Sequence, residues 1–290
     1  MSIVKLSEHV VSPAASVEAA ALKQPPRSRN LLQAVRQYGA KTLTIADLEI
    51  RKLWHDPTEL FTRAVQPALW LLVFGEVFTR THAIPTGGLP YLDFMAPGIL
   101  AQSVLFVAIF YGIAIIWERD LGITHKFLAS PTPRTALVLG KALSASVRAT
   151  VQAFIVYLLA LILGVHVNWN PLALLGTLFF VILGAACFST FSLIIACIVK
   201  TRERFMGIGQ VLTMPLFFAS NAIYPLSIMP AWLRFVAVIN PLTYMVDGLR
   251  ALMLPGAIQF SALGLDLLVL LAITIAMVVI GGRLYPRVVI

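Results

Sequence analysis

Charged residues are scarce in this sequence. Only 12% of the 290 residues are Asp, Glu, Lys or Arg, whereas 59% are hydrophobic and the mean hydropathy is +0.88. A soluble domain carries about 25% charged residues, because a surface that faces water needs them. The composition therefore excludes a soluble globular protein and predicts an integral membrane protein that is surrounded by lipid.

Cysteines are few, and the histidines form no cluster. Cys187 and Cys197 fall within one apolar run, where we expect them to pack as small apolar side chains. The five histidines are scattered along the chain, and none lies within a predicted span. No His-Glu-x-x-His sequence occurs, and no nucleophile stands at helical spacing from a partner. The sequence therefore predicts neither a metal site nor an intramembrane enzyme.

A phosphate-binding loop is also missing. Gly140-Lys141 is the one Gly-Lys pair, but Thr135 takes the place of the first glycine and Ala142 that of the hydroxyl residue. The segment leads into an apolar helix rather than following a strand. We therefore expect this chain to bind no nucleotide cofactor and not to be an ATP-hydrolysing enzyme, so that any ATPase would be a separate subunit.

The net charge of +9 would indicate nucleic acid binding in a soluble protein. Here most Lys and Arg residues fall in loops on one side of the predicted topology, so we expect no nucleic acid partner. The first thirty residues contain no apolar core of signal-peptide type. Membrane insertion is therefore expected to use the first span, which would stay in the mature protein.

Six apolar runs approach the ~20 residues that are needed to cross the hydrocarbon core. Because backbone groups in lipid must pair within their own segment, we expect an all-α membrane protein with six transmembrane helices. The predicted spans are about residues 64–79, 95–117, 143–165, 172–199, 205–223 and 263–281. Pro67 is expected to kink the first of them.

The loops between these spans alternate in charge. Basic residues occur in the loop of residues 118–134, in the loop of residues 200–204 and near the C-terminus, whereas residues 81–94 and 166–171 contain no Lys or Arg. Basic loops stay on the cytoplasmic side. The pattern therefore predicts a multi-pass protein of the cell (inner) membrane with both termini in the cytoplasm.

The N-terminal region differs from the rest. Residues 1–29 are predicted to be a disordered cytoplasmic tail. Residues 30–56 alternate apolar and basic positions and predict an amphipathic interfacial helix, with an ordinary soluble amphipathic helix as the alternative. Asp56-Pro57 is a helix start, and the transmembrane domain is expected to occupy residues 57–287.

Residues 224–250 are apolar but are interrupted by Pro225, Pro230 and Pro241. The pieces between the prolines are too short to span a membrane. We expect two short external re-entrant helices, at roughly residues 230–239 and 241–250. Asp247 and Arg250 are three residues apart, so they are predicted to pair on one helix face.

Several charged residues fall within or beside the predicted spans. Glu76 and Asp266 suggest a proton pathway, because acidic groups in lipid are costly, but either could instead lie near the interface and pair with Arg80 or Arg250. Arg148 follows small residues of the third span and either reaches lipid phosphates or contributes to a gate. Glu76, Arg148, Asp247 and Arg250 are therefore candidate pathway or gate residues.

The longest internal basic loop has charged ends and an apolar centre. The candidate coupling residues in it are Glu118, Arg119, Asp120, Leu121, Gly122, Phe127 and Leu128. Such a segment can press its apolar face into a groove on a cytoplasmic partner. The alternative is an interfacial helix without any partner.

Four stretches together make the chain resemble the ABC-2 permease family, the membrane subunits of ABC exporters of the daunorubicin-type drug-resistance branch. They are Asp56-Pro57 with Gln66-Pro67-Ala68-Leu69-Trp70, Met95-Ala96-Pro97-Gly98-Ile99, Trp117-Glu118-Arg119 through Pro131 with Gly140-Lys141, and Asn240-Pro241-Leu242-Thr243-Tyr244 to Arg250. They occur in the family's order and spacing, from about residue 50 to the end.

The resemblance implies a type V exporter fold and two protein partners. One is a second permease, identical or related, and the other is an ABC ATPase subunit that docks on the surface helix and the loop of residues 118–128. The external helices would cap the translocation path. The implied function is ATP-driven export of amphipathic drugs or lipids. A lipid-linked glycan exporter, a proton-coupled carrier using Glu76 and a membrane scaffold that transports nothing remain alternatives.

Overall fold

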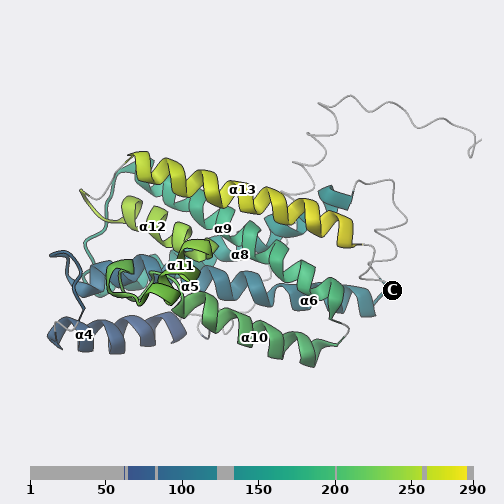
Figure 1. Cartoon of the computed structure of the whole chain (residues 1–290), viewed down its shortest axis with the longest axis horizontal. Helices are drawn as coiled ribbons and strands as arrows, with labels where there is room; N and C mark the ends of the chain where they lie inside the picture. Colours follow the sequence, from purple (N-terminus) through teal and green to yellow (C-terminus); the bar gives the residue numbers. More distant parts are fainter. Residues whose placement is uncertain are drawn as a thin grey trace, which may run out of the picture. The chain divides into compact units, whose positions relative to one another are not determined.

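The computed structural model describes residues 62, 65–81, 84–122, 134–199, 201–256 and 260–285. In this part of the chain every regular element is a helix (Figure 1). The elements are η1 (Trp70–Gly75), α4 (Glu76–Thr81), α5 (Tyr91–Phe110), α6 (Gly112–Asp120), α8 (Arg134–Ile162), α9 (Pro171–Ile198), α10 (Arg202–Phe218), η2 (Leu226–Ile228), α11 (Ala231–Ile239), α12 (Pro241–Met253) and α13 (Phe260–Leu284). The predicted tail and interfacial helix, residues 1–29 and 30–56, lie outside the described residues.

Four helical stretches are long and apolar enough to cross a membrane. They are Tyr91–Asp120, Leu137–Ile162, Pro171–Ile198 and Ala262–Leu284, and each overlaps a predicted span. Together with the sequence they establish a multi-pass membrane protein. The first and fifth predicted spans fall on shorter helical stretches, η1 with α4 and the 17-residue α10. The count of six spans therefore stays a prediction.

Helix α5 forms the centre of the bundle. Every residue from Asp93 to Leu105 is buried, although Pro97 lies within the helix. The helix packs against α8, α9, α12, α10 and η1, so side chains on all of its faces are covered. After Tyr111 the chain continues as α6, and the two helices make one stretch of 30 residues from Tyr91 to Asp120.

Helix α8 begins at Arg134, nine residues before the start of the predicted third span at residue 143, so the helix extends beyond that span. Pro133 is the last helix breaker before it, and nothing in the sequence stops the helix from including the polar residues that follow. Small residues lie on the covered side of α8, since Ala145, Ala149 and Ala153 are all buried. Ser146 Oγ donates a hydrogen bond to the carbonyl of Ile182 at 3.0 Å, which shows how closely α8 and α9 approach.

The first predicted span contains an irregular turn. Residues Trp70–Gly75 form a π-helix, three residues after Pro67, whose missing N–H cannot pair in a regular α-helix. The turn sets Trp70 against Phe74, with ring centroids 4.4 Å apart, and against Phe217, at 5.5 Å. The first span is thereby held to the end of α10 by aromatic contacts.

Two short helices occur close to the residues predicted for the external re-entrant helices. Helix α11 begins at Ala231 and ends at Ile239, and α12 begins at Pro241. Asn240 caps α12, since its side-chain oxygen accepts from Leu242 N at 3.0 Å while Pro241 occupies the first helical position. Figure 1 shows α12 toward one end of the bundle and α6 toward the other.

Candidate functional site

One end of the bundle gathers the charged residues that the sequence proposed for coupling. We call it the basic end, and it comprises residues 118–122, 134–141 and 201–205. Glu118 forms an ion pair with Lys141 of α8, and Asp120 pairs with Arg202 of α10 at 2.8 Å. The guanidinium of Arg202 also stacks 3.6 Å from the Trp117 ring centroid. The ends of three helices are thus tied together at one place.

The candidate coupling residues differ in exposure. Arg119 bonds to Asp120 at 3.2 Å, and its side chain is only 18% exposed. Leu121 is 67% exposed and follows the last turn of α6, after which Gly122 takes a positive φ of 71° that suits glycine. Phe127 and Leu128 lie outside the described residues. Leu121 is therefore the described apolar side chain of this segment that a partner can reach.

The other end of the bundle contains a polar cluster around an arginine that is mostly covered, at 14% side-chain exposure. Arg250 of α12 pairs with Asp247 at 3.2 Å, as the sequence predicted from their spacing. It also donates to the carbonyl of Asn221 at 2.8 Å, and its guanidinium lies 3.9 Å from the Phe94 ring centroid. The Asn221 amide in turn donates to the Asp247 carboxylate. We call Phe94, Asn221, Asp247 and Arg250 the Arg250 latch.

The charge state of the latch follows from its burial. Burial lowers the pKa of Arg250 to about 10, while the Asp247 carboxylate opposes the shift. The guanidinium therefore stays charged at neutral pH. A charged group taken out of water needs partners for its donors, and the latch supplies a carboxylate, a backbone carbonyl and an aromatic face. The arrangement fixes α12 against α5 and against the segment after α10.

Further hydrogen bonds secure the same end. The amide of Asn240 donates to the carbonyls of Leu216 and Ala219, which tie the start of α12 to the end of α10. Tyr91 Oη donates to the carbonyl of Ile223 at 3.0 Å. The sequence marked Asn240 as part of a helix start but gave no signal for these contacts, because their partners lie 21 to 132 residues away along the chain.

The two acidic candidates for a proton pathway lie in different settings. Glu76 is 60% exposed at the side chain and pairs with Arg80, one helical turn away, at 2.7 Å. That is the interfacial pairing that the sequence offered as the alternative to a proton site. Asp266 is buried on α13, with 7% of its surface exposed. The structure does not bring Glu76 into the Arg250 latch.

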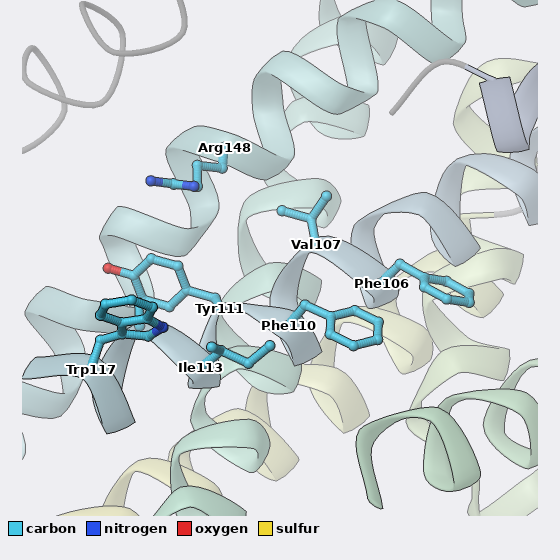
Figure 2. Close-up of a pocket in the computed structure, with 8 residues that line it drawn as sticks. Phe106, Val107, Phe110, Tyr111, Ile113, Trp117 and Arg148 are labelled. Atoms are coloured by element: carbon cyan, nitrogen blue, oxygen red, sulfur yellow. The ribbon is translucent and has the colours of Figure 1, made fainter. Parts of the chain in front are cut away.

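Arg148 lines a cavity between α5/α6 and α8 (Figure 2). The cavity has a volume of about 430 Å³. Its walls are Phe106, Val107, Phe110, Tyr111, Ile113, Ala114, Trp117 and Arg148. A second cavity of about 210 Å³ shares Phe106 and Val107 with the first and adds side-chain amides, notably Gln102 and Gln152. The sequence singled out Arg148 but not the aromatic rings around it.

Comparison with known proteins gives the chain its family. The model of the ABC-2 type transporter family matches residues 40–254. The ycf38 protein of Cyanophora paradoxa, named as a transport permease, is 30% identical over 208 residues, which are 71% of each chain. The daunorubicin resistance ABC transporter permease protein DrrB1 of Streptomyces coeruleorubidus is 26% identical over 231 residues, 80% of this chain and 81% of that protein. The YbhR protein of Escherichia coli (strain K12), named as a multidrug ABC transporter permease, is 31% identical over 174 residues, 58% of this chain and 46% of that protein. With a match over most of its length and long apolar helices, the chain belongs to the ABC-2 type transporter family of membrane permeases.

Proposed function

We propose that this chain is the transmembrane subunit of an ATP-driven exporter that moves amphipathic drugs or lipids out of the cytoplasm or the inner leaflet. Proteins of the ABC-2 family work with a separate ABC ATPase subunit, and relatives are named for daunorubicin and multidrug transport. The observation that carries the proposal is the basic end, where the charged turn of α6 is tied to α8 and α10 and presents an exposed Leu121.

The proposal assigns the basic end to the cytoplasm and to the ATPase. ATP and Mg would be bound by that subunit, because this sequence has no phosphate-binding loop. Closure of the ATPase would push on the turn at residues 118–122. A second permease, identical or related, would bind a second ATPase and complete the exporter. Six spans with both termini in the cytoplasm would put the basic end on the cytoplasmic side of the membrane.

The helices supply a path for the motion. Helices α5 and α6 form one stretch from Tyr91 to Asp120, so a push on the turn after Asp120 acts along a single element. Near the far end of that stretch, Phe94 contacts Arg250 of α12. A tilt of α5/α6 would therefore shift the external helices, which are the expected cap of the translocation path. This account needs no catalytic residue on the permease.

The ion pair of Glu118 with Lys141 affects the design of a docking test. Replacing both Glu118 and Arg119 by alanine would remove charges that also hold α6 to α8. Leu121 is the better target, because its exposed side chain follows the helix and its replacement leaves those ion pairs in place. A carboxylate at this position would oppose entry into an apolar groove.

The experiment is affinity purification of the full chain from its native membranes in mild detergent, with mass spectrometry of the proteins that accompany it. We expect an ABC ATPase with the wild-type chain, and at least tenfold less of it with Leu121→Asp. Leu89→Asp is the control, since Leu89 is also exposed but precedes α5 at its other end. The proposal fails if no ATPase accompanies the wild-type chain, and the docking role fails if Leu121→Asp retains it.

A further inference from the structure

We propose that the two adjoining cavities between α5/α6 and α8 form a binding site for an anionic amphipathic molecule. Its apolar body would lie among the aromatic rings of the larger cavity, its anionic group beside Arg148, and an oxygen acceptor beside Gln102 in the smaller one. The proposal rests on the proposed function, because it names the chemical class of the cargo. It is tested on the permease alone.

The larger cavity suits an apolar body. Four of the eight residues that line it are aromatic, namely Phe106, Phe110, Tyr111 and Trp117. Figure 2 shows Phe106 and Phe110 toward one end of the cavity and Tyr111 with Trp117 toward the other. Aromatic faces give a planar or chain-like ligand a large contact area. Trp117 is 49% exposed, so the site is reachable from outside the bundle.

Arg148 supplies the positive charge. Among the described residues that line the cavity it is the one with a charged side chain, and its guanidinium carbon lies 5.9 Å from the Tyr111 ring centroid. A guanidinium has five N–H donors, so it can bind an oxyanion while it keeps another contact.

Arg148 lies within the apolar stretch of α8, which runs from Leu137 to Ile162. It is seven residues beyond Lys141, the last residue of α8 in the basic end, or about 10 Å along the helix at ~1.5 Å per residue. A cation within an apolar helix is costly and is usually found at a functional site. The cavity beside Arg148 has room for an anionic group as an additional contact.

The smaller cavity adds an independent observation. Gln102 on α5 is only 2% exposed, yet its Nε2 has no hydrogen-bond partner among the described residues. A buried donor without an acceptor carries a free-energy cost. Gln102 lines the cavity together with Ser103 and Gln152, so a ligand oxygen placed there would satisfy the amide. Phe106 and Val107 line both cavities, so the two cavities are neighbours, and we propose that one molecule reaches from one into the other.

Two fluorescent probes test the proposal. The full chain would be purified into nanodiscs of phosphatidylcholine, and protein-dependent fluorescence would be titrated with 8-anilinonaphthalene-1-sulfonate and with N-phenyl-1-naphthylamine, which keeps the rings but lacks the sulfonate. We expect saturable binding of both. Arg148→Gln should weaken binding of the sulfonate about tenfold and leave the neutral probe unchanged, whereas Phe110→Ala should weaken both.

The control is Arg204→Gln, because Arg204 is an exposed cation of the basic end that does not line the cavity. If Arg148→Gln does not fold, Arg148→Lys retains the charge but loses the planar fork, and should give a smaller loss for the sulfonate alone. The proposal is overturned if the sulfonate does not bind saturably, or if the Arg148 variant that folds affects both probes equally.

A second arm identifies the source of the anion. Nanodiscs with about one fifth phosphatidylglycerol would be compared with neutral ones. Weaker apparent binding of the sulfonate in the anionic discs, abolished by Arg148→Gln, would assign the site to a lipid headgroup. Unchanged binding would assign it to a free anionic amphiphile. Because no ATPase is present, failure here leaves the proposed function standing, and loss of the ATPase partner leaves this result standing.

Discussion

The two ends of the bundle use the same kinds of residues in opposite ways. At the basic end, Asp120 and Arg202 pair while about a third of each side chain stays exposed, at 37% and 34%. At the other end, the Arg250 side chain is only 14% exposed and lies among Asp247, Asn221 and Phe94, although the Asp247 side chain, at 38%, is as exposed as that of Asp120. An exposed ion pair contributes little to the free energy of unfolding and remains available to a partner. A buried cation lowers stability strongly when one of its binding partners is removed. The basic end is therefore suited to binding a partner, whereas the Arg250 latch is suited to fixing helices against one another.

Removal of Arg250 should have the largest effect. Arg250→Ala leaves Asp247 without its cation and Asn221 O without its donor, which should reduce the free energy of unfolding by about 3 kcal/mol. Reversible unfolding in mixed micelles of mild detergent and dodecyl sulfate would measure this change. The double variant Asp247→Leu with Arg250→Leu should recover part of the loss, since no unpaired charge remains. A loss under about 1 kcal/mol for Arg250→Ala would show that the latch contributes no more to stability than an exposed ion pair such as that of the basic end.

A glycine beside the latch should give the next largest effect. A Cβ added at Gly98 would lie 2.3 Å from the carbonyl oxygen of Ala222 and 2.7 Å from its Cα. Backbone atoms cannot move aside as a side chain can, so Gly98→Ala should cost about 1–3 kcal/mol.

The matched control for this variant is Gly207→Ala in α10. No heavy atom lies within 4 Å of the added methyl group there, so alanine should be neutral or should stabilise the helix by up to about 1 kcal/mol. The unfolding midpoints of the two variants, measured by scanning calorimetry in detergent, should therefore move in opposite directions or by clearly different amounts. Equal shifts would contradict the close approach of α5 to Ala222.

Local signals in the sequence predicted several features at the two ends of the bundle, namely helix starts and ion pairs within one helix. Pro230 and Pro241 gave the starts of α11 and α12 to within a residue, because proline fixes the backbone at a helix start. Spacing gave the pairing of Asp247 with Arg250, whereas the pair of Glu76 with Arg80 had been only an alternative to a proton pathway. These contacts span one turn of helix, so a single segment contains all the information that they need.

Contacts between distant segments could not be predicted from such local signals. Arg202 meets Asp120 across 82 residues, and Arg250 meets Asn221 across 29. The cavity beside Arg148 depends on the packing of α5/α6 against α8, which spacing within either segment does not reveal. The apolar run that gave the third span did not show how far the helix extends, since α8 continues through polar residues to Arg134.

Substitution of Arg202 should have the smallest effect and completes the comparison. Arg202→Gln removes a partly exposed ion pair with Asp120 and a stacking contact with Trp117 at 3.6 Å. Each is worth up to about 1 kcal/mol at an exposed site, so the free energy of unfolding should fall by no more than about 2 kcal/mol.

Salt separates the two contributions of Arg202. The ion-pair part should shrink in about 0.5 M NaCl, since the Debye length then falls to a few ångströms. Arg202→Lys should keep most of the ion pair and lose most of the stacking, so its deficit should change less with salt than that of Arg202→Gln. Urea or dodecyl sulfate titration at two salt concentrations measures both. The contrary result would be a loss as large as that of Arg250→Ala that does not change with salt. It would mean that the ion pairs of the basic end are shielded from solvent in the permease alone, so that this end must open before any ATPase can dock.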